Sequence, residues 1–273
     1  MTDLVQSEPV NALGVRRIRL NRPEARNAQN PALIYALDRA FLEASQDPKT
    51  KVIVLSGNGP HFSSGHDMRD ASKPIPGETQ GTWGEFDAPG CEGRFAVEEE
   101  LYLGMCRRWR DLPKPTIAQV HGKVMAAGLM LAWVCDLIVA ADDTQFLDPV
   151  VAFGMPGVEY FLHPWELGPR RAKHMLFTGE PVTASDALAM GMVSQIARLE
   201  DLEVRVDELA ARIAKQPLMA LKLAKLSVNG MLEAQGQRAA VDQAFALHQL
   251  GHAHNQDLFG FPMDPTNLRV QGE

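Results

Sequence analysis

The chain has 273 residues, of which 45% are hydrophobic and 22% are charged, and its net charge is -7 at pH 7. The length is enough for a large core, the composition is ordinary for a globular protein, and the negative charge argues against general nucleic-acid binding. Three cysteines, Cys91, Cys106 and Cys135, show no zinc or redox spacing. We therefore expect buried thiols in a reducing compartment and predict no metal site.

The start of the chain lacks the basic and apolar regions of a secretory signal peptide. The most apolar run, residues 124–135, is too short to span a bilayer. These features predict a cytoplasmic protein with no membrane association. The net charge still permits an anionic ligand, because a local basic cluster contains Arg16, Arg17, Arg22 and Arg26.

Strand and helix patterns alternate through the first half of the chain. Asn30 followed by Pro31 predicts the start of a helix that ends near residue 45. Prolines at 113 and 115 close a helix predicted from about residue 94 to 112, and residues 70–94 predict a long surface loop. Strands are predicted at residues 15–20, 51–56, 116–120, 136–141 and 145–147, with an apolar helix over 127–134.

From residue 165 the pattern becomes helical. Helices are predicted from 165 to about 178 and over 184–190, 201–215, 217–231 and 233–250. Alternating strands and helices followed by helices alone predict an α/β fold with a helical C-terminal portion, divided near residue 200.

Two glycine-bearing turns each lie between a predicted strand and a probable helix start. The first, residues 62–68, is Phe-Ser-Ser-Gly-His-Asp-Met, and the second, residues 121–128, is His-Gly-Lys-Val-Met-Ala-Ala-Gly. Small residues and free N–H groups at a helix start can hold an oxyanion without side-chain chemistry. Taken alone, the first turn is better explained as a strand-to-helix connection and the second as tight helix packing.

Taken together and in this order, the motifs resemble the crotonase superfamily, the enoyl-CoA hydratase/isomerase group. Residues 20–28, Leu-Asn-Arg-Pro-Glu-Ala-Arg-Asn-Ala, are similar to the opening signature of that family, and the two turns match its oxyanion segments. The resemblance spans about residues 12–230. Further matching segments are residues 135–141, 177–179, 184–187 and 191–193.

The resemblance implies a crotonase-type core of repeated β-β-α units that binds an acyl-CoA thioester over residues 1–200. It also implies a C-terminal helical trimerisation region over residues 201–273, a homotrimer or homohexamer, and no cofactor apart from the coenzyme A of the substrate. By position, the backbone N–H groups of His66 and Ala127 would hold the thioester oxygen as it becomes an enolate. Substrate-binding positions carried over from the family are Ala25, Arg26, Ser64, Gly65, Asp67, Met68, Val124, Ala126, Gly128, Met130 and Val150.

The chain departs from the family at the two catalytic glutamates of the hydratases, where it has Met130 and Val150. Neither side chain can transfer a proton. Candidate substitutes are Glu159 and Asp148, although Asp148 is also explained as a strand-end cap and Glu159 as a first-turn or subunit-contact charge.

Three other features of the sequence have simpler interpretations. Tyr160 and His163 are expected to be packed rings, and the glutamate run at residues 98–100 is expected to be a solvated helix face.

The sequence therefore predicts an acyl-CoA-processing enzyme of the enoyl-CoA hydratase/isomerase family, a lyase or isomerase of fatty acid metabolism, in which ordinary hydratase chemistry is disfavoured. The alternatives are a non-catalytic acyl-CoA binding protein or a decarboxylase or hydrolase of the same superfamily. The Gly-His-Asp turn at residues 65–67, which some decarboxylases of this superfamily share, keeps the decarboxylase open.

Overall fold

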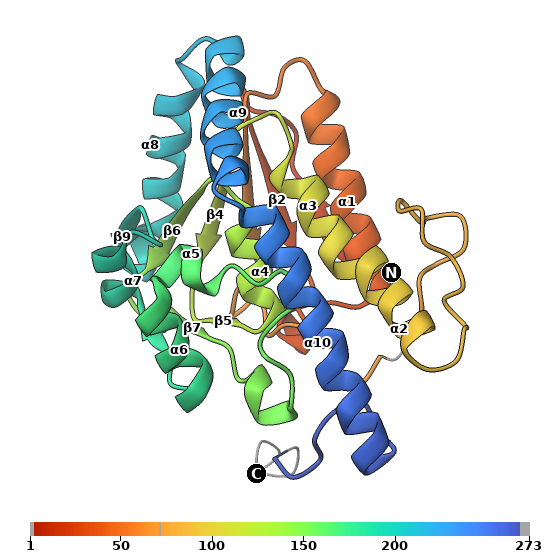
Figure 1. Ribbon diagram of the computed structural model, residues 1–273. Helices are drawn as coiled ribbons and strands as arrows, with labels where there is room; N and C mark the ends of the chain where they lie inside the picture. The colour runs from red at the N-terminus through yellow and green to blue at the C-terminus, as the bar shows by residue number, and fades with distance from the viewer. Residues whose placement is uncertain (1–2, 71, 268–273) are drawn as a thin grey trace.

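The computed structural model, which describes residues 3–70 and 72–267, is built around a six-stranded sheet (Figure 1). Neighbouring strands are parallel except for β1 and β2, which are antiparallel. The strands, in their order across the sheet, are β1 (Val5–Ser7), β2 (Val15–Leu20), β3 (Val52–Gly57), β4 (Thr116–Val120), β6 (Leu137–Ala141) and β9 (Gln195–Ala197). The predicted strands and the α/β class are confirmed.

A smaller second sheet contains β5 (Lys123–Met125), β7 (Gln145–Leu147) and β8 (Val182–Thr183). Strand β4 of the large sheet leads directly into β5 and then into helix α4 (Ala127–Trp133), and β6 likewise leads into β7. After β3, Ser63 forms a bridge with Val124 of β5. The chain thus passes from the large sheet to the small one repeatedly, which is the β-β-α repeat expected from the resemblance.

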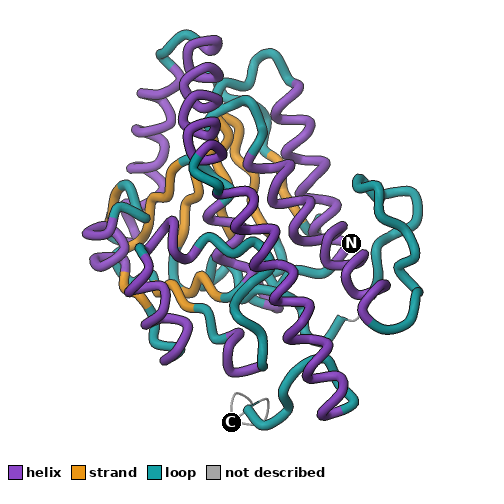
Figure 2. Tube along the Cα trace, viewed as in Figure 1, coloured by secondary structure: helices purple, strands orange, loops and turns teal. Residues whose placement is uncertain are grey.

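Each buried strand of the large sheet sends alternate side chains to opposite faces. Ile53 and Leu55 of β3 face the larger core, whereas Val52 and Val54 face a second cluster that includes Val206 of helix α8 (Leu202–Ala214). Helices α1 (Pro31–Gln46), α3 (Gly104–Arg110) and α4 therefore cover one face of the sheet, and α8 covers the other. Figure 2 shows the strands in the middle of the molecule with helices around them.

The helices follow the predicted pattern with shifted ends. Their bounds are α1 (Pro31–Gln46), α2 (Cys91–Glu98), α3 (Gly104–Arg110), α5 (His163–Leu167), α6 (Pro169–Thr178), α7 (Ala184–Met190), α8 (Leu202–Ala214), α9 (Leu218–Ala234) and α10 (Gln237–Phe259), with short 3-10 turns at Pro23–Ala25, Val150–Phe153 and Leu199–Asp201. The division of the chain at residue 200 stays a prediction. Residues 1, 2, 71 and 268–273 of the predicted segments lie outside the described residues.

A π-helical turn (Glu99–Leu103) joins α2 to α3, so the helix predicted over 94–112 is continuous but not regular. The expectation that its glutamate run faces solvent is wrong for Glu98 and Glu100, which are buried. The carboxylate of Glu100 accepts hydrogen bonds from the Tyr35 hydroxyl and from the backbone N–H groups of Gln80 and Gly81. The preceding loop covers this side of the helix, which is why the carboxylate is not solvated.

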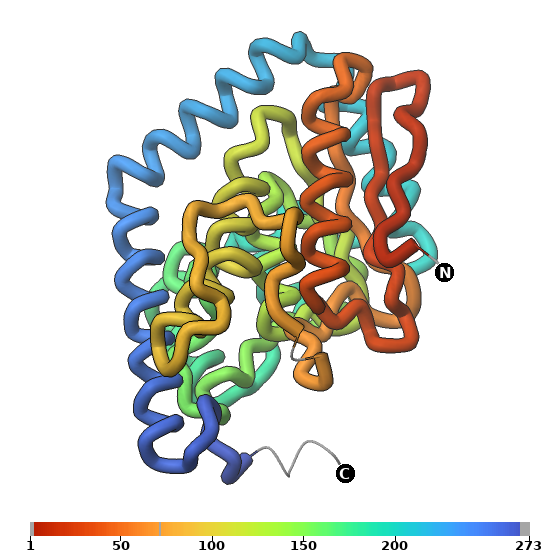
Figure 3. Tube along the Cα trace, turned by 90° about the vertical axis from the view of Figure 1, so that its right-hand side faces the viewer, coloured from red at the N-terminus to blue at the C-terminus, as the bar shows by residue number. Residues whose placement is uncertain are grey.

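The last two helices run along the outside of the molecule (Figure 3). Lys225 is the buried residue of α9, and its ammonium lies 2.9 Å from Asp136. The expectation of buried thiols holds for Cys106 and Cys135 but is wrong for Cys91, which opens α2 at the surface. No helix in the described part of the chain is both long and apolar enough to cross a bilayer.

Candidate active site

The two glycine-bearing turns lie against each other, backbone to backbone. The N–H of Met125 donates to the carbonyl oxygen of Ser63 over 3.0 Å. Gly65 has a φ of +89°, and a Cβ on it would lie 3.1 Å from the backbone nitrogen of Ala127. A Cβ on Gly128 would lie 2.5 Å from the carbonyl oxygen of Ser63. Glycine at both positions is therefore what allows the turns to touch.

The backbone N–H groups of His66 and Ala127 have no hydrogen-bond acceptor among the described residues. Ala127 is the first residue of α4, where the N–H has no partner within the helix. His66 forms a parallel bridge with Gln29 in which the hydrogen bonds are made by Gly65 and Asp67, so its own N–H points the other way. Because the turns touch, the two free N–H groups belong to neighbouring segments of backbone, as the predicted oxyanion site requires.

Ala126, just before the free N–H of Ala127, has an unusual backbone conformation. Its φ is 49° and its ψ is -122°, a region that L-residues rarely adopt. The conformation is held by hydrogen bonds from its N–H to the carbonyl oxygen of Leu147 and from the Leu129 N–H to its own carbonyl oxygen. Backbone strain of about 1–3 kcal/mol is typical of residues that orient a functional group.

Residues of the opening signature hold the first turn in place. The Arg22 guanidinium lies 2.9 Å from a carboxylate oxygen of Asp67 and also donates to the carbonyl oxygen of Ala28 over 2.6 Å. The side-chain amide of Asn27, which is fully buried, donates to the carbonyl oxygens of Asn58, His61 and Phe62. These contacts join the opening signature to the first turn.

The side chain of His66 pairs with Glu159. Its Nε2 lies 2.9 Å and 3.1 Å from the two carboxylate oxygens, which brings together one predicted oxyanion residue and one predicted acid/base residue. The Tyr102 ring, contributed by the π-helical turn, lies against the imidazole with ring centroids 3.8 Å apart. The other ring nitrogen, Nδ1, has no hydrogen-bond partner in the described part of the chain.

The pKa values of this pair move in opposite directions. Burial alone lowers the pKa of His66, but the charge of Glu159 and the hydrogen bond to it outweigh this effect. The charge of Glu98 raises the pKa further and that of His252 lowers it. The pKa of His66 therefore lies above its ordinary 6.5. Burial alone raises the pKa of Glu159, but His66, and then His248, bring it below its ordinary range. The pair is therefore arranged to favour an imidazolium facing a carboxylate.

Asp148, the second predicted acid/base candidate, is fully buried with a different set of partners. Its carboxylate accepts the backbone N–H groups of Val150 and Val158 and lies 2.8 Å from Nε2 of His163. The His163 ring packs between Trp133 and Phe161. These contacts are those of a strand-end cap and a packed ring.

The remaining predicted site residues surround the two turns with different exposures. Met130 and Val150 are buried, and the Met130 sulfur accepts the backbone N–H of Tyr160 over 3.4 Å. Ala25, Ser64, Asp67 and Ala126 are half-buried, Arg26 and Met68 are exposed, and Gly65, Val124 and Gly128 are buried.

No sequence motif predicts a role for Tyr102, His248 or His252, which lie beside the His66–Glu159 pair. His248 lies 3.7 Å from Glu159, and His252 lies one helical turn further along α10. Two histidines four residues apart share one face of a helix, so this spacing was a readable signal. Nothing in the sequence separates Tyr102 from other helical aromatics.

The two-sheet α/β architecture and its packed turns define a protein of the crotonase superfamily. The chain belongs to the enoyl-CoA hydratase/isomerase family, whose model matches residues 11–258.

Individual relatives support the same assignment. The chain is 44% identical over 270 residues to EchA13 of Mycobacterium tuberculosis, a protein assigned to the enoyl-CoA hydratases, with 94% of this chain and 83% of that protein covered. It is 33% identical over 233 residues to the mitochondrial enoyl-CoA hydratase domain-containing protein 3 of Xenopus laevis, covering 81% and 72% of the two chains. The crystal structure of a probable enoyl-CoA hydratase from Mycobacterium smegmatis matches with a TM-score of 0.86 at 42% identity, covering 96% and 99%.

The strain at Ala126 generates a stability prediction. Ala126→Gly removes the steric cost of the positive φ, and we expect the free energy of unfolding to rise by about 1 kcal/mol after the added flexibility of the unfolded chain is subtracted. Urea denaturation measures this change. The control is Ala189→Gly in helix α7, which should lower stability by about 0.5–1 kcal/mol. Equal losses in both variants would show that Ala126 carries no strain.

Proposed function

We propose that this protein is an acyl-CoA isomerase that forms a thioester enolate, with His66 and Glu159 as the groups that move the proton. The observation that carries the proposal is the double role open to His66. Its backbone N–H joins that of Ala127 at one oxyanion position, while its imidazole, held through Nε2 by Glu159, has Nδ1 free. Membership of the family supports the acyl-CoA substrate.

The proton transfer follows from the arrangement of the ring. With Nε2–H donating to the carboxylate of Glu159, neutral His66 has its lone pair on Nδ1, which takes a proton from a carbon activated by the thioester. The C–H electron pair moves into the conjugated system and the charge develops on the thioester oxygen, where the two N–H groups stabilise it. Returning the same proton to another carbon shifts the double bond and restores neutral His66.

Glu159 has the role of the carboxylate in a serine-protease triad: it fixes the tautomer and stabilises the imidazolium that forms. The face of the Tyr102 ring adds to that stabilisation. One base is enough for a double-bond shift because the proton is returned, whereas adding water to an alkene also requires activation of the water. Met130 and Val150 supply no group for that second task, which favours isomerisation over hydration.

The remaining predicted contacts complete the proposed substrate site. Arg26 and Met68 are exposed beside the first turn, where they are available to the coenzyme A portion, with Ala25, Ser64 and Asp67 behind them. Met130 and Val150 provide an apolar surface for the acyl chain. The site needs no cofactor other than the coenzyme A of its substrate. Two buried free thiols, Cys106 and Cys135, support the cytoplasmic location that we also propose.

The outer surface of α9 supports a homo-oligomer, a trimer or a pair of trimers. Met219, Leu223 and Leu226 form an exposed apolar stripe, since residues four and three apart share a helix face. The three side chains are at least half exposed, at 64%, 50% and 59%. An apolar stripe of this kind on an outlying helix is typical of a protein–protein interface.

The reaction is tested with purified protein and a 3-enoyl-CoA, by following the appearance of the conjugated thioester. We expect turnover that falls about 100-fold or more in each of His66→Gln and Glu159→Gln, because the first removes the base and the second removes the carboxylate that orients it. Exposed His174 and Glu180 form a similar pair, and Glu180→Gln is the matched control that should leave the rate unchanged. Hydration of crotonyl-CoA at a comparable rate, or an undiminished rate in both site variants, would contradict the proposal.

The pH profile of kcat/KM tests the ionisation of His66. Only neutral His66 can act as a base, so the rate should rise with pH along a limb whose midpoint lies above pH 6.5. In Glu159→Gln the carboxylate that raises the pKa of His66 is absent, and the limb of the residual activity should move to lower pH. A limb at the same pH in both proteins would mean that another group titrates.

The oligomer is tested by light scattering coupled to size exclusion. Leu226→Glu places a charge on the apolar stripe, and we expect the assembly to dissociate at micromolar concentration. Ser227→Glu, which puts the same charge on a neighbouring exposed position of α9, should leave the assembly intact. A monomeric wild-type protein would refute the proposed assembly.

A further inference from the structure

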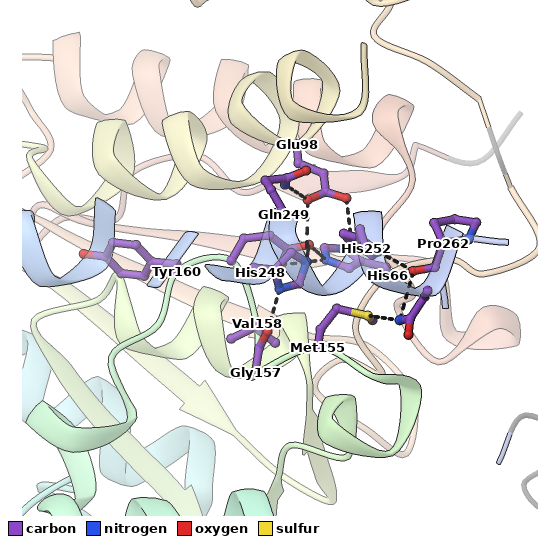
Figure 4. Close-up of polar contacts among 12 residues, drawn as sticks. His66, Glu98, Met155, Gly157, Val158, Tyr160, His248, Gln249, His252 and Pro262 are labelled. Carbon is purple, nitrogen blue, oxygen red and sulfur yellow. Dashed lines mark hydrogen bonds and ion pairs between the residues drawn. The ribbon is translucent and has the colours of Figure 1, made fainter. Parts of the chain in front are cut away.

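Three buried ligand-type side chains converge beside the proposed active site. Glu98 ends α2, and His248 and His252 lie one turn apart on α10. Nε2 of His252 lies 3.1 Å from one carboxylate oxygen of Glu98, and Nε2 of His248 lies 3.5 Å from the other. The three ligand atoms all lie within 4.8 Å of one another. Figure 4 shows the two imidazoles extending from α10 toward Glu98.

The tautomer of each imidazole is fixed by its other nitrogen. Nδ1 of His248 lies 2.7 Å from the carbonyl oxygen of Gly157, and Nδ1 of His252 lies 2.6 Å from that of Pro262. A carbonyl oxygen can only accept, so each Nδ1 carries a hydrogen and donates. In the neutral ring, Nε2 then carries no hydrogen and its lone pair is free to accept or to bind a metal. Backbone carbonyls in this role are the usual orienting partners of metal-binding histidines.

Two lone pairs directed at a carboxylate repel it unless a positive charge lies between them. Nε2 of His248 has no hydrogen-bond partner in the described part of the chain. A proton on His252 satisfies one contact and leaves His248 unmatched. Protons on both would place two imidazolium rings with centroids 4.6 Å apart around a single carboxylate. One divalent cation satisfies all three ligands at once.

We propose that Glu98, His248 and His252 bind a borderline divalent transition-metal ion, of which Zn²⁺ is the probe of choice. Two imidazoles and one carboxylate are the donor set of His₂Glu zinc sites, and they leave positions for water. The side-chain amide of Gln249 donates to Glu98, which orients the carboxylate as a supporting contact does in established metal sites. Glu159, 3.7 Å from Nε2 of His248, lies at the edge of the site.

The ion would join parts of the chain that are far apart in sequence. It would link α2 to α10 and, through the orienting carbonyls, the Gly157 turn to the segment after α10. Tyr102 lies in the π-helical turn that begins directly after Glu98, and Glu159 follows Gly157 by two residues. Metal binding should therefore stiffen one wall of the site, and its measurement does not depend on any reaction being catalysed there.

Metal uptake is measured on untagged, chelator-treated full-length protein without acyl-CoA. We expect calorimetry and elemental analysis to give one Zn²⁺ per chain, and the midpoint of thermal unfolding to rise when Zn²⁺ is added. Bound Co²⁺ should show the visible absorption bands that are typical of a low coordination number. His248→Asn keeps a donor for the Gly157 carbonyl oxygen but removes Nε2, and Glu98→Gln removes the charge at constant shape. Each substitution should lower the affinity for Zn²⁺ by about 100-fold or more. Losing only an orienting partner typically lowers metal affinity by about 10–100-fold.

The matched control is His254→Asn, which changes an exposed histidine on the same helix and should bind Zn²⁺ as the wild type does. Circular dichroism checks that each variant is folded. Absence of stoichiometric uptake by the wild-type protein overturns the proposal, as does equal uptake by wild type, His248→Asn and Glu98→Gln. Failure of the isomerase assay leaves this result unaffected, because no substrate is present.

Discussion

The site depends on one close approach, that of the backbone of residues 63–65 to the backbone of residues 125–128. Gly65 and Gly128 have no room for a Cβ, and a methyl group at either one would separate the turns. The Met125 N–H donates to Ser63 across this contact, and the Phe62 N–H donates to His121 just before it. The Asn27 amide donates to the carbonyl oxygen of Phe62 and so also holds the first turn. Because the contact is between main chains, it fixes the directions of N–H groups independently of any side-chain rotamer.

That contact also fixes the position of the His66 imidazole. His66, whose N–H has no acceptor among the described residues, carries a ring whose direction is set by Glu159 and Tyr102. Glu159 comes from a different part of the chain, the segment between β7 and α5, and its carboxylate is almost completely buried. A buried carboxylate that is paired with an imidazole retains its charge, and that charge raises the pKa of the ring above its ordinary 6.5.

The strands were predictable from the sequence because their side chains alternate between two buried faces, as Ile53 and Val54 do. The two turns were predictable because glycine marks close approaches of the backbone. The partnership of His66 and Glu159 was not, since no local pattern relates residues 93 positions apart. The burial of Glu98 and Glu100 was also missed, because a glutamate run indicates solvent unless a distant loop or helix covers it. Helix α10 and the loop before α2 are those covers.

The π-helical turn between α2 and α3 allows one continuous helix to meet two unrelated partners. Beyond the turn, Trp109 packs against Phe41 and donates to Asp38 of α1. Before it, Glu98 faces α10. Each residue of a regular α-helix adds a rotation of about 100° around the helix axis. Deleting one residue from this turn would therefore rotate Glu98 away from α10 while Trp109 kept its contact with Phe41. The π-helical turn therefore lets one helix contribute to the apolar core at one end and to a polar cluster at the other.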